Sequence, residues 1–123
     1  MKECVFCTTP KEEKIYQNKY GYIKKDHFPV TKGHMLIIPH KHVENIWGLS
    51  SEELKGLWEL VTWAREYNQK NYQVKDFNVG FNDGKNAGQT VFHLHIHVIP
   101  RYKGDMGNPR GGVRGVIPSK QKY

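Results

Sequence analysis

Three histidines in the last third of the chain have the residue type and spacing to do chemistry together. His93, His95 and His97 alternate with apolar residues over positions 93–98. Strict alternation is the period of a β-strand with two different faces. The pattern therefore predicts a strand whose three imidazoles point to one side and whose aliphatic side chains point to the other. Pro100 is predicted to end this strand, because proline has no amide hydrogen for a ladder hydrogen bond.

Neutral imidazole is both a nucleophile and a metal ligand near pH 7, so the histidine row suits two chemistries. In the first, the central His95 attacks a phosphorus atom while the flanking histidines orient it and bind the phosphate oxygens. In the second, the row holds a metal ion, since His-x-His is a plausible spacing for a metal site. The alternation by itself leaves both open, beside a purely structural role for the three side chains.

Length and composition set the frame for this row. A chain of 123 residues that is 37% hydrophobic and 25% charged is large enough for one domain with one core, spanning residues 1–123. It contains no apolar run of the length that crosses a membrane, and its first residues do not form a secretory signal. We therefore expect a cytoplasmic protein that has no membrane partner.

The positive charge of the chain is concentrated behind the histidine row. The net charge is +7, and residues 101–123, rich in glycine, proline and arginine, hold six basic residues against Asp105. We expect this C-terminal tail to be extended, lying on the surface or crossing to a partner subunit. Its field favours an anionic partner such as a nucleotide, a polyphosphate or nucleic acid. The alternative is that the tail is a solvated surface with no ligand.

The two cysteines, Cys4 and Cys7, form a Cys-x-x-Cys motif. A redox pair of this spacing usually opens a helix after a strand, and no strand precedes it here. The motif can also supply half of a zinc site, whose other two ligands would come from elsewhere, with histidine the obvious source. Two thiols without a metal are the remaining interpretation.

The hydrophobic patterns predict an α+β fold: a five-stranded, mostly antiparallel sheet with one long and one short helix. Ser50 or Ser51 caps the long helix, which runs to about Tyr72, and Glu53 completes a capping box after Ser50. The predicted strands cover residues 14–18, 20–25, 34–38, 77–81 and the histidine row, and the short helix covers 43–47. The apolar stripe of the long helix consists of Leu57, Leu60, Val61, Ala64 and Tyr67, widened by Leu54 and Trp58.

A glycine-containing loop, 82–89, joins the strand 77–81 to the histidine row, so these two strands are predicted to form an antiparallel hairpin. Such a loop at the edge of a row of imidazoles can aim backbone N–H groups at a phosphate. A plain hairpin connection is the alternative. Two further histidines, His27 and His40, fall in turns and are predicted to be surface residues.

The segment His93–Ile99 matches His-φ-His-φ-His-φ-φ, where φ is apolar, and resembles the signature of the histidine triad, or HIT, family. The flanking residues 82–84, 87–90 and Pro100-Arg101 look like its fragile-histidine-triad branch, together with bacterial diadenosine polyphosphate hydrolases. The resemblance implies a homodimer in which two five-stranded sheets join edge to edge. It also implies hydrolysis or transfer of nucleotidyl groups at an α-phosphate through a nucleotidyl-histidine.

The resemblance assigns roles to single residues. It implies that His95 is the nucleophile and that His97 hydrogen-bonds the α-phosphate and assists proton transfer to the leaving group. His34, after Gly33, would be a fourth histidine that supports the others. The positions that would contact substrate are Asp26 at the ribose, Asn82, Gln89 and Thr90 at the phosphates, and Ile23 in the segment that encloses the base.

The resemblance also bears on metals and partners. In zinc-bearing bacterial members the first histidine of the row joins a metal, which implies a zinc site made of Cys4, Cys7, His42 and His93. A divalent cation such as Mg²⁺ could accompany the nucleotide. The expected partner is a nucleotide or dinucleotide rather than nucleic acid. Candidate substrates are diadenosine tetraphosphate or triphosphate, a nucleoside phosphoramidate and an adenylated amine.

Two other classes of function make different predictions. A metalloenzyme that uses the whole row as ligands would hold its metal near all three histidines and lose activity with a chelator. A module that binds nucleotides without catalysis would form no nucleotidyl-protein adduct.

Overall fold

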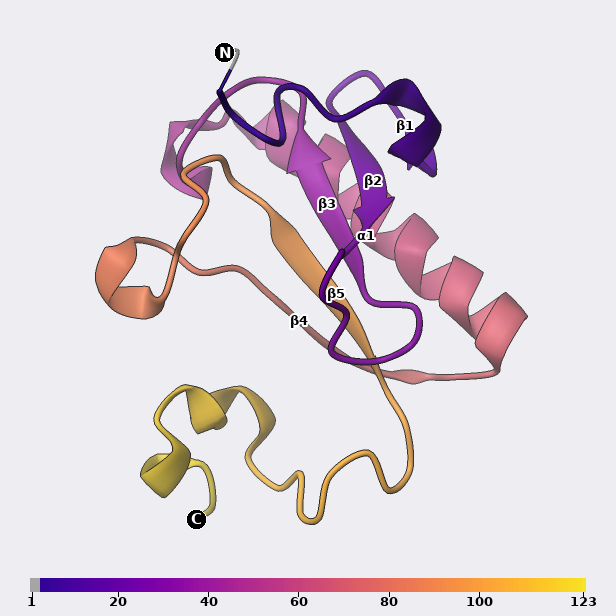
Figure 1. Cartoon of the computed structure of the whole chain (residues 1–123), viewed down its shortest axis with the longest axis vertical. Helices are drawn as coiled ribbons and strands as arrows, with labels where there is room; N and C mark the ends of the chain where they lie inside the picture. Colours follow the sequence, from indigo (N-terminus) through magenta and orange to yellow (C-terminus); the bar gives the residue numbers. More distant parts are fainter. Residues whose placement is uncertain (1–2) are drawn as a thin grey trace.

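An antiparallel sheet of five strands is the frame of the molecule, seen in a computed structural model that describes residues 3–123 (Figure 1). The strands are β1 (Tyr16–Gln17), β2 (Gly21–Lys25), β3 (Met35–Pro39), β4 (Asp76–Gly80) and β5 (Ile96–Arg101). They lie in the order β1-β2-β3-β5-β4, and every neighbouring pair is antiparallel. The predicted α+β class is confirmed.

The strand β5 has other limits than the sequence predicts. It begins at Ile96, because the amide of Leu94 donates to the carbonyl of Val43, 2.7 Å away, outside the sheet. It also continues through Pro100, which lies opposite Phe77 of β4. The carbonyl of Pro100 accepts the hydroxyl of Thr31, on the side where β3 no longer pairs with β5. The missing amide hydrogen therefore costs no ladder hydrogen bond.

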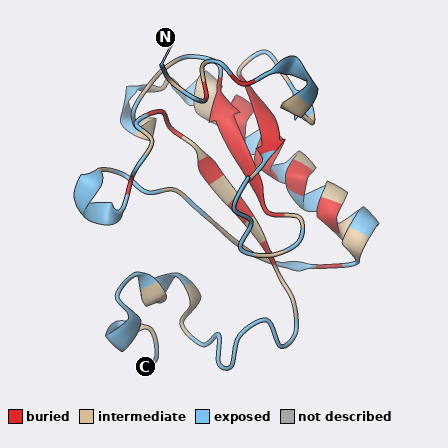
Figure 2. Cartoon of the chain, viewed as in Figure 1, coloured by how far each residue is buried: buried red, intermediate tan, exposed pale blue. Residues whose placement is uncertain are grey.

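The helix α1 (Ser51–Tyr72) covers one face of the sheet and closes the core (Figures 1 and 2). The hydroxyl of Ser50 accepts from the amide of Glu53, and the Glu53 carboxylate accepts from the amide of Ser50, so the predicted capping box is confirmed. The core residues of the helix are Leu57, Leu60, Val61 and Ala64, packed on Ile23, Ile37, Leu94, Ile96 and Val98. Trp58, predicted to widen the stripe, is exposed instead.

The register of the strands puts different residues on the two faces of the sheet. Ile23 lies opposite Ile37, which lies opposite Ile96, and this row faces the helix. The next row is Lys24, Leu36 and His97, and it faces away from the helix because successive side chains alternate. The chemistry of the histidine row is therefore presented on the face that α1 leaves open.

The loop between β4 and β5 makes the predicted hairpin, with register pairs from Asp76↔Arg101 to Gly80↔His97. It contains a short 3-10 turn, Lys85–Ala87, flanked by Gly84 and Gly88 at φ values of 96° and 94°. Both values lie in the left-handed region that favours glycine. The predicted short helix is likewise a 3-10 turn, Ile46–Gly48, whose first amides are capped by the Asn45 side chain.

After β5 the chain leaves the sheet and forms two 3-10 turns, Gly112–Val116 and Pro118–Lys120, apart from the helix (Figure 1). Arg101 anchors the start of this tail through a two-bond ion pair with Asp105 and a hydrogen bond to Asn78 at 2.6 Å. Within residues 3–123, none of the helices combines the length and apolar character that a bilayer-spanning segment needs.

Candidate active site

A cavity of about 820 Å³ opens on the face of the sheet that α1 leaves uncovered. His95 and His97 line its floor, whereas His93 does not. Segments on both sides of β5 make its walls. The N-terminal half of the chain contributes Val5, Phe6, Lys24, Asp26, His27, Phe28, Val30, His34 and Leu36, and the part from β4 to β5 contributes Asn78, Val79, Gly80, Phe81, Asn82, Thr90, Val91 and Ile99. Val113 and Val116 of the C-terminal tail complete the lining.

The hydrogen bonds of His95 leave one ring nitrogen free for chemistry. Its Nδ1 lies 2.9 Å from the backbone carbonyl of His93. A carbonyl only accepts, so Nδ1 carries the proton, and the lone pair is on Nε2. The ring packs on Phe6, with centroids 5.0 Å apart, and is partly exposed to the cavity. In the neutral ring of His95, the nitrogen left free for a ligand in the cavity is therefore Nε2.

The tautomer of His97 follows from His34 in the same way. The amide of Val30 donates to Nδ1 of His34 at 3.0 Å, so the proton of a neutral His34 is on Nε2. This Nε2 donates to Nδ1 of His97 at 2.9 Å. A neutral His97 then carries its own proton on Nε2. When both rings are neutral, His95 thus offers a nitrogen lone pair and His97 offers an N–H donor.

Burial keeps His34 and His97 neutral at physiological pH. Burial is the main cause that lowers the pKa of His97 to about 4, and the neighbouring rings of His95 and His34 add to it. The pKa of His34 is also lowered by burial, against the opposing effect of the Asp26 carboxylate. Neutral rings suit a phosphorus centre that is surrounded by anionic oxygens. These oxygens would repel an anionic group but do not repel a neutral imidazole, and the lone pair of a neutral imidazole is not taken by a proton.

His34 is positioned by the turn before it. Gly33 has φ of 92°, and a Cβ built on it would lie 1.9 Å from the Asn68 side-chain oxygen. Asn68 is completely buried in α1, and its amide donates to the carbonyls of Gly33 at 3.2 Å and Ala64 at 2.9 Å. No larger residue fits at Gly33. Asn68 was not predicted as part of the site, and its only sequence signal is a polar residue inside a helix pattern.

Asp26 lies in the cavity, as predicted for a substrate contact. One carboxylate oxygen accepts from the amide of Phe28 at 2.9 Å, and the other lies 3.3 Å from Nε2 of His34. The second oxygen also lies 3.8 Å from Nδ1 of His97. The carboxylate is therefore held at the end of β2, beside the two neutral imidazoles, where it can accept from a ligand.

Asn82 and Thr90 line the cavity on the β4 side, in agreement with the prediction. Gln89, also predicted to contact a phosphate, is not among the residues that line the cavity. Its side chain is 5% exposed, its oxygen accepts from the amide of Gly84, and its nitrogen donates to the carbonyls of Glu44 and Val91. All of its polar groups are used to hold the loop in shape, which leaves none for a substrate.

Ile23, predicted to help enclose the base, does not line the cavity either. Its side chain has no exposed surface and belongs to the core cluster beneath α1. The neighbouring Lys24 lines the cavity in its place, together with Phe6 of the N-terminal segment. A register shift of one residue exchanges the two faces of a strand. The sequence signal at this end of β2 is a pair of lysines, Lys24 and Lys25, and it does not tell which of the two faces the cavity.

The first histidine of the row belongs to a separate cluster with Cys4, Cys7 and His42, which could hold a metal ion. Nε2 of His93 donates to the carbonyl of Pro39 at 2.9 Å, so Nδ1 has the lone pair. This Nδ1 lies 3.4 Å from the Cys4 sulfur, 3.5 Å from the Cys7 sulfur and 3.1 Å from Nδ1 of His42. The remaining contact, from the Cys7 sulfur to Nδ1 of His42, is 3.2 Å.

These distances fit a tetrahedral zinc ion. Bonds of about 2.3 Å to sulfur and about 2.0 Å to nitrogen place neighbouring ligand atoms roughly 3.3 to 3.8 Å apart. Two sulfurs and two ring nitrogens are the donor set that zinc prefers in structural sites. The prediction of a site at these four residues therefore agrees with the geometry. Its position ties the N-terminal segment, which carries Phe6, to the start of the histidine row.

The metalloenzyme alternative predicts that all three histidines of the row surround one metal ion. The structure does not bring them together in this way. Within residues 3–123, His93 belongs to the cysteine cluster and His97 to a second group with Asp26 and His34. His95 belongs to neither group. His27 and His40 are exposed, as predicted.

Comparisons with known proteins agree with this geometry. The chain matches the HIT domain over residues 8–104. It is 35% identical over 109 residues to Protein hit of Bacillus subtilis, covering 85% of this chain and 75% of that protein. It is 36% identical over 93 residues to a bis(5'-adenosyl)-triphosphatase of Saccharomyces cerevisiae, covering 75% of this chain but 45% of that protein.

A solved structure gives the same answer for the fold. The crystal structure of a Zn-bound histidine triad family protein from Mycobacterium smegmatis superposes with a TM-score of 0.76 at 33% identity, covering 85% of this chain and 78% of that one. The resemblance inferred from the histidine row is thereby confirmed, and the chain belongs to the HIT domain family.

Proposed function

We propose that this protein is a nucleotide hydrolase that acts at the α-phosphate of dinucleoside polyphosphates or related nucleotidyl conjugates, through a nucleotidyl group carried on His95. The observation that supports it best is the hydrogen bond from Nδ1 of His95 to the His93 carbonyl at 2.9 Å. This bond leaves Nε2 as a nucleophile facing the cavity. The similarity to a bis(5'-adenosyl)-triphosphatase supports the class of substrate.

In the first step, the Nε2 lone pair of His95 forms a bond to the α-phosphorus, and the bond from phosphorus to the leaving-group oxygen breaks. The leaving nucleotide departs with the electron pair as a phosphate oxyanion, which is weakly basic and needs no proton. The His95 ring then carries a positive charge, which the His93 carbonyl at Nδ1 stabilises. The N–H of His97 donates to an oxygen of the transferring group, where negative charge is concentrated.

In the second step, water attacks the phosphorus, and the bond from phosphorus to Nε2 of His95 breaks. The attacking water loses a proton to solvent, the nucleoside monophosphate leaves, and the lone pair returns to Nε2. A neutral imidazole is suited to both steps, because an anionic nucleophile would be repelled by the phosphate oxygens. Asp26 would contact the ribose, and Asn82 and Thr90 the remaining phosphates, from opposite walls of the cavity.

The test is a rapid-quench experiment with a dinucleoside polyphosphate labelled at the α-phosphate. We expect a transient label on the wild-type protein that is stable to alkali and labile to acid, as a phosphoramidate is. His95→Ala should form no adduct and lose turnover by on the order of 10³-fold or more, while still binding nucleotide.

His40→Ala, an exposed histidine outside the cavity, is the matched control and should keep both adduct and turnover. Turnover above a few per cent in His95→Ala would contradict the assignment of the nucleophile. A protein that binds the dinucleotide but forms neither adduct nor product would be the non-catalytic binding module instead.

We further propose that Cys4, Cys7, His42 and His93 hold a structural zinc ion. The ligand spacing of 3.1 to 3.5 Å among the atoms in contact supports it, as does a Zn-bound relative with 33% identity. Zinc at this site would take no part in the reaction. It would hold the N-terminal segment, and with it Phe6, against the wall of the cavity.

We also propose that two copies of the chain join through their β4 strands into a continuous sheet. β4 lies at the edge of the sheet and, within residues 3–123, pairs only with β5. A five-residue edge with open backbone groups is a ready site for strand pairing. Light scattering should give twice the 14.4 kDa mass of one chain, and the mass of one chain would contradict this proposal.

A further inference from the structure

Lys24 is a lysine in a place where lysines are rarely found. It is the fourth of the five residues of β2, with 4% of its surface exposed, and it lines the cavity of the candidate active site. Lysine is almost never buried unless its charge is paired. The mechanism proposed for His95 and His97 makes no use of it, so its position calls for a separate explanation.

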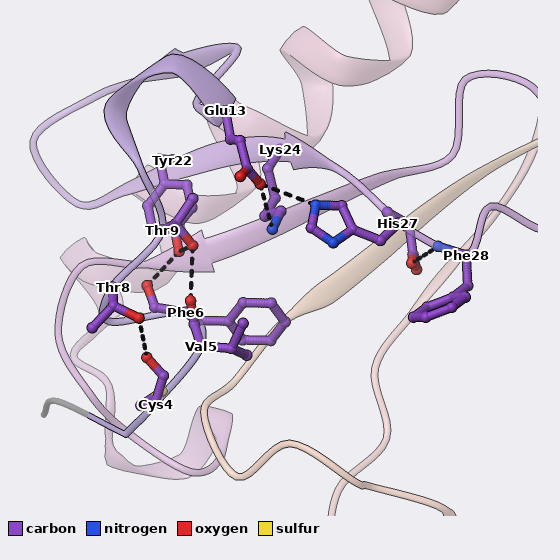
Figure 3. Close-up of polar contacts among 11 residues, drawn as sticks. Cys4, Val5, Phe6, Thr8, Thr9, Glu13, Tyr22, Lys24, His27 and Phe28 are labelled. Atoms are coloured by element: carbon purple, nitrogen blue, oxygen red, sulfur yellow. Dashed lines mark hydrogen bonds and ion pairs between the residues drawn. The ribbon is translucent and has the colours of Figure 1, made fainter.

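The ammonium of Lys24 has one charged partner and two further donors. Glu13 accepts from Nζ of Lys24 at 3.2 Å, and the same carboxylate oxygen accepts from Nε2 of His27 at 3.0 Å (Figure 3). The hydrogen bonds from His27 and Lys24 lower the pKa of Glu13, so this carboxylate is ionised. An ammonium has three N–H donors. Within residues 3–123, Glu13 is the one acceptor found for it, which leaves two donors for a ligand.

The surroundings of Lys24 suit a flat, neutral ring. Its Nζ lies 5.9 Å from the centre of the Phe6 ring. His27 and the exposed Phe28 line the same end of the cavity (Figure 3). The carboxylate of Glu13 next to the ammonium would repel a phosphate, which argues against a phosphate contact. A heterocycle with acceptor atoms at its edge meets no such repulsion.

The register places this end of the cavity at the correct distance from the reacting atoms for a base. Lys24 and His97 lie in one row across the sheet, separated by Leu36 of β3. Two strand spacings make about 10 Å, enough for a ribose between the phosphate and the base. Asp26, the expected ribose contact, comes two residues after Lys24, and its carboxylate lies 3.8 Å from Nδ1 of His97. This step rests on the proposed function.

We infer that Lys24 reads the nucleobase and selects a purine with an oxygen at position 6, guanine or hypoxanthine, over adenine. Guanine presents two acceptors, O6 and N7, at one edge, whereas adenine presents one acceptor, N7, beside an amino donor at position 6. The Lys24 ammonium can only donate, so its two free donors pair with both atoms of the first edge but meet a donor at position 6 of the second. Lys24 is then a specificity residue, and Glu13 is a positioning residue that orients the ammonium.

The test measures binding of GMP, IMP and AMP by calorimetry, which reads the base without turnover. We expect the wild-type protein to bind GMP and IMP about fivefold or more tightly than AMP. Lys24→Met keeps the length of the side chain and should bring the three affinities together, with that for AMP unchanged. Lys25→Met, an exposed lysine one residue along β2, is the matched control and should leave the preference intact.

Glu13→Gln gives the test of the positioning role. It should reduce the preference for GMP and IMP by less than Lys24→Met does, and leave the binding of AMP unchanged. Equal or tighter binding of AMP by the wild-type protein would overturn the inference, and this result needs no variant. So would a preference for GMP that IMP does not share, because the 2-amino group would then be the group that is read.

An equal loss of affinity for all three nucleotides in Lys24→Met would also overturn the inference, because that is the result expected if Lys24 contacts a phosphate. Turnover separates this inference from the proposed function. The ratio of kcat/KM for bis(5'-guanosyl) and bis(5'-adenosyl) tetraphosphate should follow the binding ratio. If the base preference holds but neither compound is hydrolysed, the proposed function alone fails. If both are hydrolysed without a base preference, the inference alone fails.

Discussion

His93 and His95 are two residues apart and have opposite ring nitrogens free. His93 donates from Nε2 to the carbonyl of Pro39 and turns its Nδ1 lone pair to two cysteines and His42. His95 donates from Nδ1 to the carbonyl of His93 and turns its Nε2 lone pair to the cavity. The same side chain can thus take the role proposed for His93, a metal ligand, or the role proposed for His95, a nucleophile, depending on which nitrogen a backbone carbonyl holds.

The surroundings of the two rings differ as much as their tautomers. His93 has no exposed surface, whereas His95 is partly open to the cavity. Burial lowers the pKa of His93 as it lowers that of His97, so a low pKa alone does not identify the reacting residue. Access to a substrate does. Each variant below alters one of two regions, the cluster around His93 or the cavity around His95, and tests whether the other region is affected.

The largest effect on stability is expected at the cysteine cluster. Cys7→Ser should lose the metal and lower the free energy of unfolding by about 4 kcal/mol when free zinc exceeds its dissociation constant a thousandfold. Elemental analysis and urea unfolding in reducing buffer measure this. The nearby Thr8→Ser keeps a hydroxyl and should match the wild type. A metal-free wild-type protein whose stability does not respond to added zinc would contradict the structural zinc.

The pH dependence of stability probes the other region. The pKa of His97 is about 4 in the folded protein and near 6.5 when unfolded, so the unfolded state takes up the proton first as the pH falls. Stability should therefore fall between pH 6.5 and pH 4, by up to about 3 kcal/mol from this residue. His97→Asn removes the group, and its unfolding free energy should fall less over this range.

Urea unfolding of the wild type and of His97→Asn at several pH values provides the measurement, and the difference between the two slopes is the quantity to follow. The carboxylates titrate in both proteins and cancel in that difference. Identical slopes would show that His97 is not held neutral by the fold.

His34 should act through the tautomer of His97. His34→Phe removes the N–H that holds the His97 proton on Nε2, so kcat should fall by about 10- to 100-fold with little change in KM. In a His97→Ala background the same change should have almost no further effect, because the residue it positions is gone. Full, additive losses in the double variant would assign His34 a role of its own.

Local patterns were sufficient for the elements of the fold. The capping box at Ser50 and Glu53 and the apolar stripe predict α1 because both depend on residues within a few turns. The alternation of histidines correctly predicts that His95 and His97 share a face. What the alternation could not show is where the strand begins. The hydrogen bond from Leu94 to Val43 depends on the chain beyond β3.

The site was predicted less well than the fold. Ile23 and Lys24 exchange roles because the pairing of β2 with β3 decides which residue faces the cavity, and no local pattern fixes that register. Gln89 has the chemistry of a phosphate contact, but its side chain folds back onto the loop. The four-residue cysteine and histidine cluster joins positions up to 89 residues apart. The Cys-x-x-Cys motif indicated half of a zinc site, and the family resemblance indicated which two histidines would complete it.

The smallest effect is expected at His40. This residue makes the same kind of hydrogen bond to a backbone carbonyl as His93 does, but in different surroundings, so it tests the bond by itself. His40 donates from Nε2 to the carbonyl of Asn18 at 3.0 Å, as His93 does to Pro39, but its ring is exposed. His40→Gln should change the free energy of unfolding by less than about 0.5 kcal/mol and leave zinc content and turnover unchanged. The same three measurements used above check this. A loss comparable to that of Cys7→Ser would mean that the carbonyl bond itself carries the stability. An unchanged protein would locate the difference in what faces the second nitrogen: two sulfurs at His93, an open cavity at His95 and solvent at His40.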